Sequence, residues 1–228
     1  MKTFTVWNHK GGTGKTSLTS LLSLYLSETS RKVLMIDLDS QESLTSGFLE
    51  ENEERKTVYD WLIGKAKIKD CIQEINPNLS IISGSLLISK IQNSVNQSVI
   101  RRDLKGLGFD FCFIDCPPTW SNSIVASINA SDKVLIPSLM SVYDLKSTKF
   151  TLNEIKDIDS ELKTFVIFNR SKSLTKLEKE LQDPLFTKST ILNFPSFTSV
   201  NTAIKTKKLK GNLKEEIERV LGSIEGIV

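Results

Sequence analysis

The sequence predicts an α/β fold with a mostly parallel, twisted β-sheet flanked by helices on both faces. Short β-branched or aromatic runs alternate with longer stretches of helical periodicity along the 228 residues, which is typical of a parallel sheet wrapped by helices. Several strand candidates are apolar throughout, as expected for strands buried on both faces. No linker, repeat or low-complexity tract divides the chain, so we expect residues 1–228 to form a single domain.

The elements follow one another in a regular order. The expected strands are residues 3–7, 32–37, 79–82, 109–115, 133–137, 165–169 and 190–192. The expected helices are residues 16–28, 86–104, 121–130, 145–158, 174–181 and 213–224. The segment from Glu50 to Asp70 is the most polar of the chain and interrupts the alternation, so we expect it to run over the surface.

Composition excludes several classes of protein. Hydrophobic residues make up 39% and charged residues 25% of the chain, which suits a globular protein with a continuous core and excludes disordered and fibrous classes. The net charge of +3 is too small to imply a polyanionic partner by itself. The three cysteines include no CxxC pair, so neither a disulfide framework nor a zinc site is indicated. With no signal-peptide core and no apolar run of about 18 residues, we expect a cytoplasmic protein.

A glycine-rich turn follows the first expected strand, where residues 8–18 read NHKGGTGKTSL. Glycines let successive backbone N–H groups and the next helix N-terminus surround phosphate oxygens. Lys15 would neutralise the β- and γ-phosphates, and the Thr16 hydroxyl would ligate Mg²⁺. The turn therefore predicts a nucleotide with β- and γ-phosphates, together with Mg²⁺, and the family resemblance described next implies that this nucleotide is ATP. The predicted phosphate-binding residues are Gly11, Gly12, Thr13, Gly14, Lys15, Thr16 and Ser17.

This turn departs from the common phosphate-loop pattern, because His9 replaces its first glycine and Lys10 precedes Gly11 and Gly12. It resembles the deviant Walker A ATPases of the ParA/MinD group, whose motif KGGxGK[ST] is present in full. The resemblance implies an ATP-dependent homodimer in which Lys10 crosses the interface and contacts the partner's nucleotide. The alternative is that Lys10 is a solvated loop charge.

Carboxylates end two of the expected strands. Asp37 and Asp39 follow an apolar run in a segment that resembles the family's DxDxQ sequence, with Ser40 in place of the usual proline. The resemblance implies that Asp39 positions the attacking water. Asp115 precedes Cys116 and two prolines, which resembles the Walker B and switch II sequence that holds the water shell of Mg²⁺. The predicted catalytic residues are Lys10, Lys15 and Asp39, and the predicted metal site comprises Thr16, Asp39 and Asp115.

Two residues are candidates for binding the adenine base. Asn169 ends an expected strand, and its amide offers a paired donor and acceptor to a base edge. The alternative is that Asn169 only caps the strand. Pro195 occupies the place at which the family closes a loop over the base, and is the second candidate. Cys112 and Cys116 are interpreted as small buried residues, with a reactive thiol as the alternative.

A lysine cluster lies near the end of the chain. Residues 201–211 carry Lys205, Lys207, Lys208 and Lys210 and no acidic residue, a pattern that fits sequence-independent binding to DNA phosphates but also a solvated face. The resemblance implies a nucleoid-associated ATPase that segregates plasmid or chromosomal DNA with a ParB-like, centromere-binding partner. Because the phosphate loop begins eight residues into the chain, we expect no N-terminal helix-turn-helix.

Four alternatives to DNA segregation remain open, the first of which is an ATPase that positions another cargo. A MinD-like membrane switch needs a terminal amphipathic helix, but the polar face of residues 213–224 is acidic, which disfavours anionic lipid, so we expect packing on the sheet and no membrane partner. A metabolic phosphate-loop enzyme of the dethiobiotin synthetase type needs its own substrate pocket. An inactive nucleotide-binding scaffold conflicts with the presence of Lys10, Lys15, Thr16, Asp39 and Asp115 together.

Overall fold

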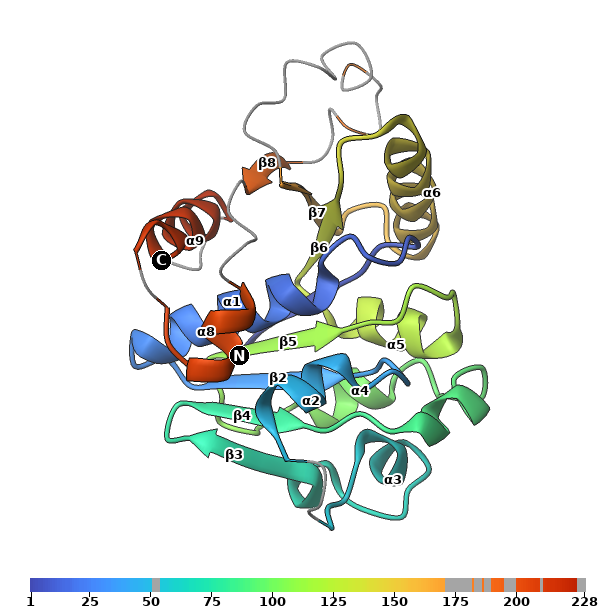
Figure 1. Cartoon of the computed structure of the whole chain (residues 1–228). Coiled ribbons are helices and arrows are strands. Elements are labelled where there is room, and N and C mark those ends of the chain that lie inside the picture. Colours follow the sequence, from blue (N-terminus) through green and yellow to red (C-terminus); the bar gives the residue numbers. More distant parts are fainter. Residues whose placement is uncertain are drawn as a thin grey trace.

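The computed structural model describes residues 1–50, 54–170, 182, 186, 190–194, 200–209 and 211–224. In this part of the chain an eight-stranded sheet runs through the molecule in the order β3-β4-β2-β5-β1-β6-β7-β8 (Figure 1). Neighbouring strands are parallel except for the pair β3 and β4. The predicted α/β fold is therefore confirmed.

The elements have the following bounds. The strands are β1 (Lys2–Val6), β2 (Val33–Asp37), β3 (Ile72–Asn76), β4 (Leu79–Ile82), β5 (Phe111–Asp115), β6 (Lys133–Ser138), β7 (Lys163–Asn169) and β8 (Thr190–Phe194). The helices are α1 (Lys15–Glu28), α2 (Ser43–Phe48), α3 (Val58–Leu62), α4 (Val99–Asp103), α5 (Asn122–Ala130), α6 (Val142–Ile158), α8 (Val200–Thr206) and α9 (Asn212–Ser223). Two 3₁₀ helices, η1 (Ile68–Cys71) and η2 (Leu86–Lys90), complete the described elements.

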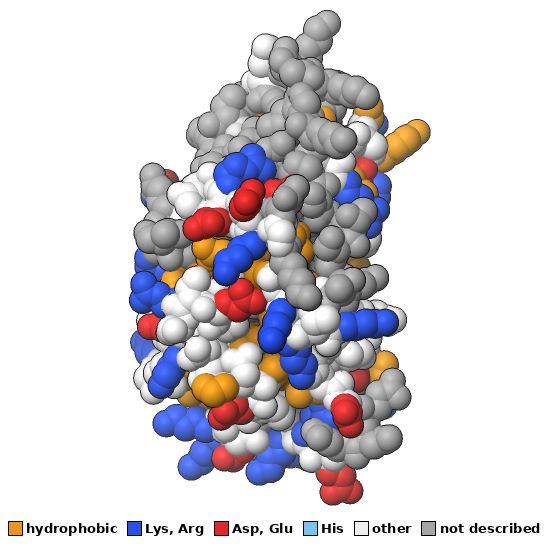
Figure 2. Space-filling view, turned by 60° about the vertical axis from the view of Figure 1, so that its left-hand side comes forward, with side chains coloured by type: hydrophobic (Ala, Val, Ile, Leu, Met, Phe, Trp, Pro, Cys, Tyr) orange, Lys and Arg blue, Asp and Glu red, His pale blue; other side chains and the backbone are white. Residues whose placement is uncertain are grey.

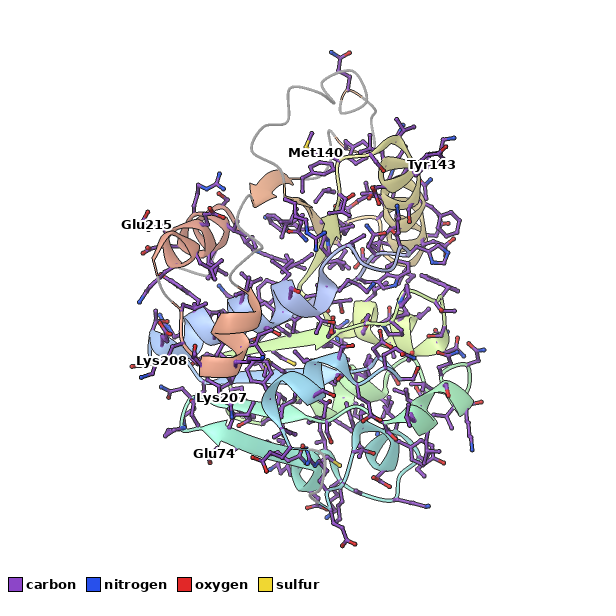
Figure 3. All side chains as sticks on the ribbon, viewed as in Figure 1. Glu74, Met140, Tyr143, Lys207, Lys208 and Glu215 are labelled. Atoms are coloured by element: carbon purple, nitrogen blue, oxygen red, sulfur yellow. The ribbon has the colours of Figure 1, made fainter. Side chains whose placement is uncertain are left out.

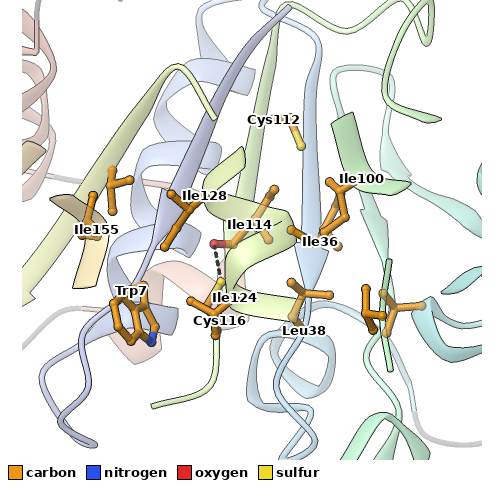
Figure 4. Close-up of a cluster of buried hydrophobic side chains, with 14 of the residues drawn as sticks. Trp7, Ile36, Leu38, Ile100, Cys112, Ile114, Cys116, Ile124, Ile128 and Ile155 are labelled. Atoms are coloured by element: carbon orange, nitrogen blue, oxygen red, sulfur yellow. Dashed lines mark hydrogen bonds between the residues drawn. The ribbon is translucent and has the colours of Figure 1, made fainter. Parts of the chain in front are cut away.

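Alternating side chains of the central strands supply two cores, one on each face of the sheet. On one face Phe4 of β1 stacks on Phe113 of β5, with ring centroids 5.1 Å apart, and this core includes residues of α1, α2, α8 and α9. On the other face Cys112 and Ile114 of β5 belong to a core that α3, α4, α5 and α6 complete (Figure 4). Helices thus cover both faces, as predicted.

The central strands end together at the edge of the sheet that carries the glycine-rich turn. Val6 of β1 pairs with Asp115 of β5, and Asp115 pairs in register with Asp37 of β2. Parallel pairing brings the carboxyl ends of strands to one edge, where α/β proteins bind ligands. The predicted carboxylates therefore lie beside the turn that joins β1 to α1.

Part of the expected element list was wrong. The long helix expected over residues 86–104 is two short helices, η2 and α4. Asn96 accepts hydrogen bonds from both the N–H and the hydroxyl of Ser98, and such local side-chain bonds compete with helix continuation. The strand β3 was missed because its partly exposed residues pair antiparallel with β4 at the sheet edge. The helix expected over 174–181 lies outside the described residues.

The polar segment from Glu50 to Asp70 does more than cross the surface. It contains α3, whose Val58 and Trp61 are buried in the second core. A single tryptophan can bury a large apolar area, which is why a segment of polar composition still packs. The three cysteines are free and buried. Burial raises the pKa of the Cys71 thiol to about 11 and raises the pKa values of Cys112 and Cys116, so the thiolate forms are disfavoured.

Candidate nucleotide site

The glycine-rich turn between β1 and α1 has the backbone freedom that a phosphate cradle requires. Gly12 and Gly14 adopt φ values of 74° and 98°, in the left-handed region that favours glycine. Gly14 is the N-cap residue of α1, so the unpaired N–H groups of the first helical turn open onto this loop. A Cβ built on Gly11 or Gly12 would meet nothing within 4 Å. The loop is therefore open on its outer side.

Lys15 begins α1 and folds back under the loop. Its side chain is buried, and its Nζ donates a hydrogen bond of 3.2 Å to the carbonyl of Lys10. Burial lowers the pKa of Lys15, while the carboxylates of Asp115 and Asp39 raise it. The ammonium group thus lies between the loop backbone and the carboxylates. There the negative charge of a ligand would offset the free-energy cost of burying the ammonium charge.

Thr16 and Asp115, two members of the predicted metal site, are in direct contact. The Thr16 hydroxyl donates a hydrogen bond of 2.6 Å to Asp115 Oδ2. The other carboxylate oxygen, Oδ1, is buried and has no hydrogen-bond partner among the described residues. Burial and the neighbouring Asp37 raise the pKa of Asp115 well above its usual range. A buried carboxylate with one unpaired oxygen, next to a hydroxyl, supplies oxygen ligands that fit a hydrated Mg²⁺ ion.

Asp39 lies in the turn that follows β2. It is half-buried, and its Oδ1 accepts a hydrogen bond of 3.0 Å from the N–H of Gln41. Its charge acts on Lys15, which places it near the phosphate loop. The contact between Thr16 and Asp115 supports two members of the predicted metal site, whereas the place of Asp39 in that site stays a prediction.

Asn169 ends β7 directly beside the phosphate loop. Its Nδ2 donates a hydrogen bond of 2.6 Å to the carbonyl of Thr13, and its buried Oδ1 has no partner among the described residues. The amide therefore fastens β7 to the loop and keeps a free acceptor. This arrangement differs from a simple strand cap, and the adenine contact stays a prediction. Pro195, the second adenine candidate, lies outside the described residues.

Asp144 is a neighbour of the phosphate loop that no motif in the sequence indicates. Lys10 Nζ lies 2.5 Å from Asp144 Oδ1 in an ion pair in which the lysine side chain is 39% exposed and the aspartate side chain 4%. Asp144 lies in the first turn of α6, which Ser141 caps by accepting a hydrogen bond from the Asp144 N–H. The SxxD spacing indicates a helix start. The same spacing does not predict that Asp144 pairs with Lys10, which lies more than 130 positions earlier in the chain.

Groups of β6 and α6 hold the backbone of the first half of the phosphate loop. Asn8 Nδ2 donates to the carbonyl of Pro137, at 2.9 Å, and to the Thr148 hydroxyl, at 3.2 Å. Asn8 Oδ1 accepts the N–H of Lys10 at 3.1 Å. The His9 N–H donates to the Thr151 hydroxyl. The backbone around Lys10 is therefore fixed by β6 and α6, while the Lys10 side chain remains partly exposed.

These features define a class of protein. A lysine and a hydroxyl at the start of the helix after β1, facing a carboxylate at the end of β5, are typical of phosphate-loop nucleoside triphosphatases. A family model described as an AAA domain matches residues 1–168. The chain belongs to the ParA/MinD superfamily of phosphate-loop ATPases.

Three known proteins illustrate the similarity. The chain is 33% identical over 174 residues to the maintenance of carboxysome distribution protein A of Synechococcus elongatus, covering 72% of this chain and 68% of that protein. It is 29% identical over 172 residues to the sporulation initiation inhibitor protein Soj of Bacillus subtilis, covering 72% and 68%. A solved structure described as a putative plasmid partition protein from Borrelia burgdorferi B31 bound to AMPPNP superposes with a TM-score of 0.83 at 24% identity, covering 100% and 99%.

Some curated relatives are longer than the matched region. The chain spans 65% of the length of an uncharacterised relative from Pseudomonas putida.

Among the described residues, no helix combines the length and the apolar character needed to cross a membrane.

Proposed function

We propose that this protein is an ATP-dependent dimerising switch that binds DNA without sequence preference and drives the segregation of plasmid or chromosomal DNA. The observation that carries the proposal is Lys10. It lies at the rim of the phosphate loop, directly before Gly11, on a fixed backbone and with a partly exposed side chain. Relatives named for chromosome partitioning support the choice of cargo.

Each residue of the site has a proposed task in ATP hydrolysis. Lys15 and the open N–H groups of the loop bind the phosphates, and Thr16 with Asp115 would hold Mg²⁺, which neutralises developing phosphate charge when bound. Asp39 orients the attacking water in line with the bond that breaks, and the free Oδ1 of Asn169 accepts a hydrogen bond from the adenine amine. Little covalent assistance is needed, because positioning and charge neutralisation supply most of the acceleration.

Dimerisation completes the site. In one chain Lys10 is paired with its own Asp144, so the lysine has to leave this partner before it reaches the nucleotide of a second chain. A triphosphate carries more charge than a carboxylate and favours that exchange. Hydrolysis then removes the attraction and releases the two chains, which makes the dimer a switch.

The ion pair with Asp144 is expected to oppose dimerisation. Asp144→Asn keeps the shape of the side chain but removes its charge, so Lys10 is free to reach the partner. Because the pair is partly exposed, its contribution is about 1 kcal/mol, roughly fivefold in a dimerisation constant. We expect analytical ultracentrifugation with ATP to show tighter dimers of Asp144→Asn. Asp157→Asn, at the solvent-exposed end of α6, is the control. Weaker or unchanged dimers would contradict the opposing role.

The proposed DNA-binding surface lies at the far end of α1 from the phosphate loop. Lys205, Lys207 and Lys208 are exposed, whereas Lys210 lies outside the described residues. Lys207 and Lys208 line a hollow with Glu28, the last residue of α1, and a helix of 14 residues spans about 20 Å. They lie on the opposite side of the molecule from Tyr143 of α6 (Figure 3).

Acidic side chains reduce the positive charge of this surface. Glu28 Oε1 accepts the Leu209 N–H, and its other oxygen lies 3.4 Å from Lys214 Nζ. Basic and acidic side chains are interspersed over the side of the molecule that carries α8 and α9 (Figure 2). The local excess of lysine that the sequence indicates is therefore partly offset by groups brought in from α1. A modest affinity per chain, strengthened when an ATP dimer presents two such surfaces, fits a DNA interaction that nucleotide controls.

Changing Lys205 and Lys208 to glutamate tests the DNA surface. We expect affinity for every duplex sequence to fall about equally. The slope of log K against log salt should become shallower by roughly 0.9 for each DNA phosphate that the variant no longer neutralises. Filter binding with ATP, ADP and no nucleotide measures both quantities. The double variant Lys65→Glu/Lys69→Glu, which changes two exposed lysines elsewhere, is the charge-matched control.

The outcomes separate the alternatives. Equal losses in both double variants would mean that net charge alone matters, and DNA affinity unaffected by the Lys205 and Lys208 changes would place the basic surface elsewhere. An unmutated protein that binds no DNA with ATP would favour another cargo, since one relative is named for carboxysome distribution.

The membrane alternative has little support, because α9 buries its apolar residues in the fold. A ParB-like protein is the proposed partner that accelerates hydrolysis.

A further inference from the structure

Thr45 joins three segments around the turn that carries Asp39. It lies in α2 and is buried. Its hydroxyl donates a hydrogen bond of 2.7 Å to Asp37 Oδ2 and accepts one of 2.8 Å from the N–H of Gly84. Its own N–H also donates to Asp37 Oδ2, at 2.9 Å. One hydroxyl therefore links the end of β2, the helix α2 and the loop that follows β4.

The second oxygen of Asp37 continues this chain of hydrogen bonds to Asp39. Asp37 Oδ1 accepts the N–H of Asp39 at 3.1 Å, and the carbonyl of Asp39 accepts the N–H of Glu42 at 3.0 Å. The path from Gly84 through Thr45 and Asp37 thus ends on the backbone of Asp39. Hydrogen bonds arranged in series strengthen one another in a buried site. Removal of the Thr45 hydroxyl therefore weakens other hydrogen bonds of this path as well as its own.

A second tether holds the same turn to the loop after β4. Glu42 adopts a left-handed φ of 53°, which is uncommon for a residue with a side chain. Its Oε1 accepts the N–H of Leu86 at the start of η2. Packing between the two segments is also close, because a Cβ on Gly84 would lie 3.0 Å from Asp37 Cγ and 3.2 Å from the Asp39 carbonyl oxygen. The loop after β4 therefore forms a support for the turn.

We propose that the Thr45 hydroxyl is a positioning group that sets where the Asp39 turn, residues 37–42, lies relative to the phosphate loop. The inference rests on the function proposed above for Asp39, which must present its carboxylate to a water in line with the phosphate. Among the described residues, the Thr45 hydroxyl bonds two protein groups, Asp37 Oδ2 and the N–H of Gly84. It acts through Asp37, and an error of about 1 Å in such placement can cost roughly 100-fold in rate.

Substitutions at Thr45 and at a matched threonine test the proposal. Thr45→Val removes the hydroxyl at nearly constant shape, and Thr45→Ser keeps it. Thr19→Val is the control, because the Thr19 hydroxyl is buried in α1 without a hydrogen-bond partner among the described residues. We expect Thr45→Val to lower kcat by about 10-fold to 100-fold with ATP affinity within about twofold, Thr45→Ser to retain most of the rate, and Thr19→Val to leave it unchanged.

Amide hydrogen exchange provides a measurement that does not depend on hydrolysis. In the nucleotide-free protein, Thr45→Val should speed exchange at Asp39 and Gly84, while Thr19→Val should not. If Thr45→Val fails to fold, Gly84→Ala serves instead, with Gly222→Ala as its control, because a Cβ on Gly222 meets nothing within 4 Å. Gly84→Ala should also reduce kcat while preserving ATP affinity.

The results distinguish this inference from the proposed function. A Thr45→Val protein with unmutated kcat and unmutated exchange at Asp39 overturns the positioning role. If Asp39→Ala itself hydrolyses ATP normally, the proposed role of Asp39 in hydrolysis fails. In that case the exchange measurement decides whether Thr45 positions the turn: faster exchange at Asp39 supports the role, and unchanged exchange overturns it.

Discussion

Lys15→Ala is expected to abolish measurable ATP binding while the protein remains folded. The lysine ammonium is buried next to the loop backbone, where hydrogen bonds between charged groups contribute about 1.5 to 3 kcal/mol each. With two phosphates contacted, the loss of affinity should exceed roughly 100-fold. Isothermal titration calorimetry with a non-hydrolysable ATP analogue measures it.

The same variant should not lose stability. Burial lowers the pKa of Lys15, which means that the folded state disfavours its charged form and gains little from it without a ligand. Thermal unfolding without nucleotide should therefore give a Tm equal to or slightly above that of the unmutated protein. Lys32→Ala, at an exposed position before β2, is the control for ATP affinity. Unchanged ATP affinity of Lys15→Ala would remove the basis for the nucleotide site.

Lys10→Ala is expected to bind ATP as a monomer and to lose both dimerisation and hydrolysis. Lys10 lies outside the loop interior that Lys15 occupies, and its partly exposed side chain pairs with Asp144. Asp39→Ala, by contrast, should still dimerise with ATP but fail to turn it over. Light scattering with ATP gives the oligomeric state, and phosphate release gives the rate.

A double variant removes an ambiguity in the Lys10 experiment. Lys10→Ala alone leaves the buried Asp144 carboxylate without its cation, and an uncompensated buried charge can itself destabilise the fold. Lys10→Ala/Asp144→Asn removes both charges. If the double variant is as stable as the unmutated protein yet stays monomeric with ATP, the loss belongs to the missing lysine. A Lys10→Ala protein that dimerises and hydrolyses ATP normally would contradict the trans role.

The local pattern predicted the fold class and the position of the glycine-rich turn between β1 and α1. The strand from Leu79 to Ile82 has the expected bounds, and α1 begins one residue before the expected start. Apolar runs and glycine spacing are local, so a sequence window carries them. The prediction of one helix over residues 86–104 was wrong because contacts outside the local apolar pattern interrupt the helix. These contacts are the hydrogen bonds of Asn96 and those of Asn122 with the loop before α4.

The candidate phosphate and metal ligands can be read from short stretches of the chain, because KGGTGKT and the aspartates that follow two apolar runs are properties of adjacent residues. The distant groups that contact these ligands become visible only in the folded protein. Asp144 meets Lys10 and Thr45 meets Gly84 because α6 and the loop after β4 pack beside the carboxyl edge of the sheet. Strand order and helix packing create these pairings, and neither is encoded in the spacing of the paired residues.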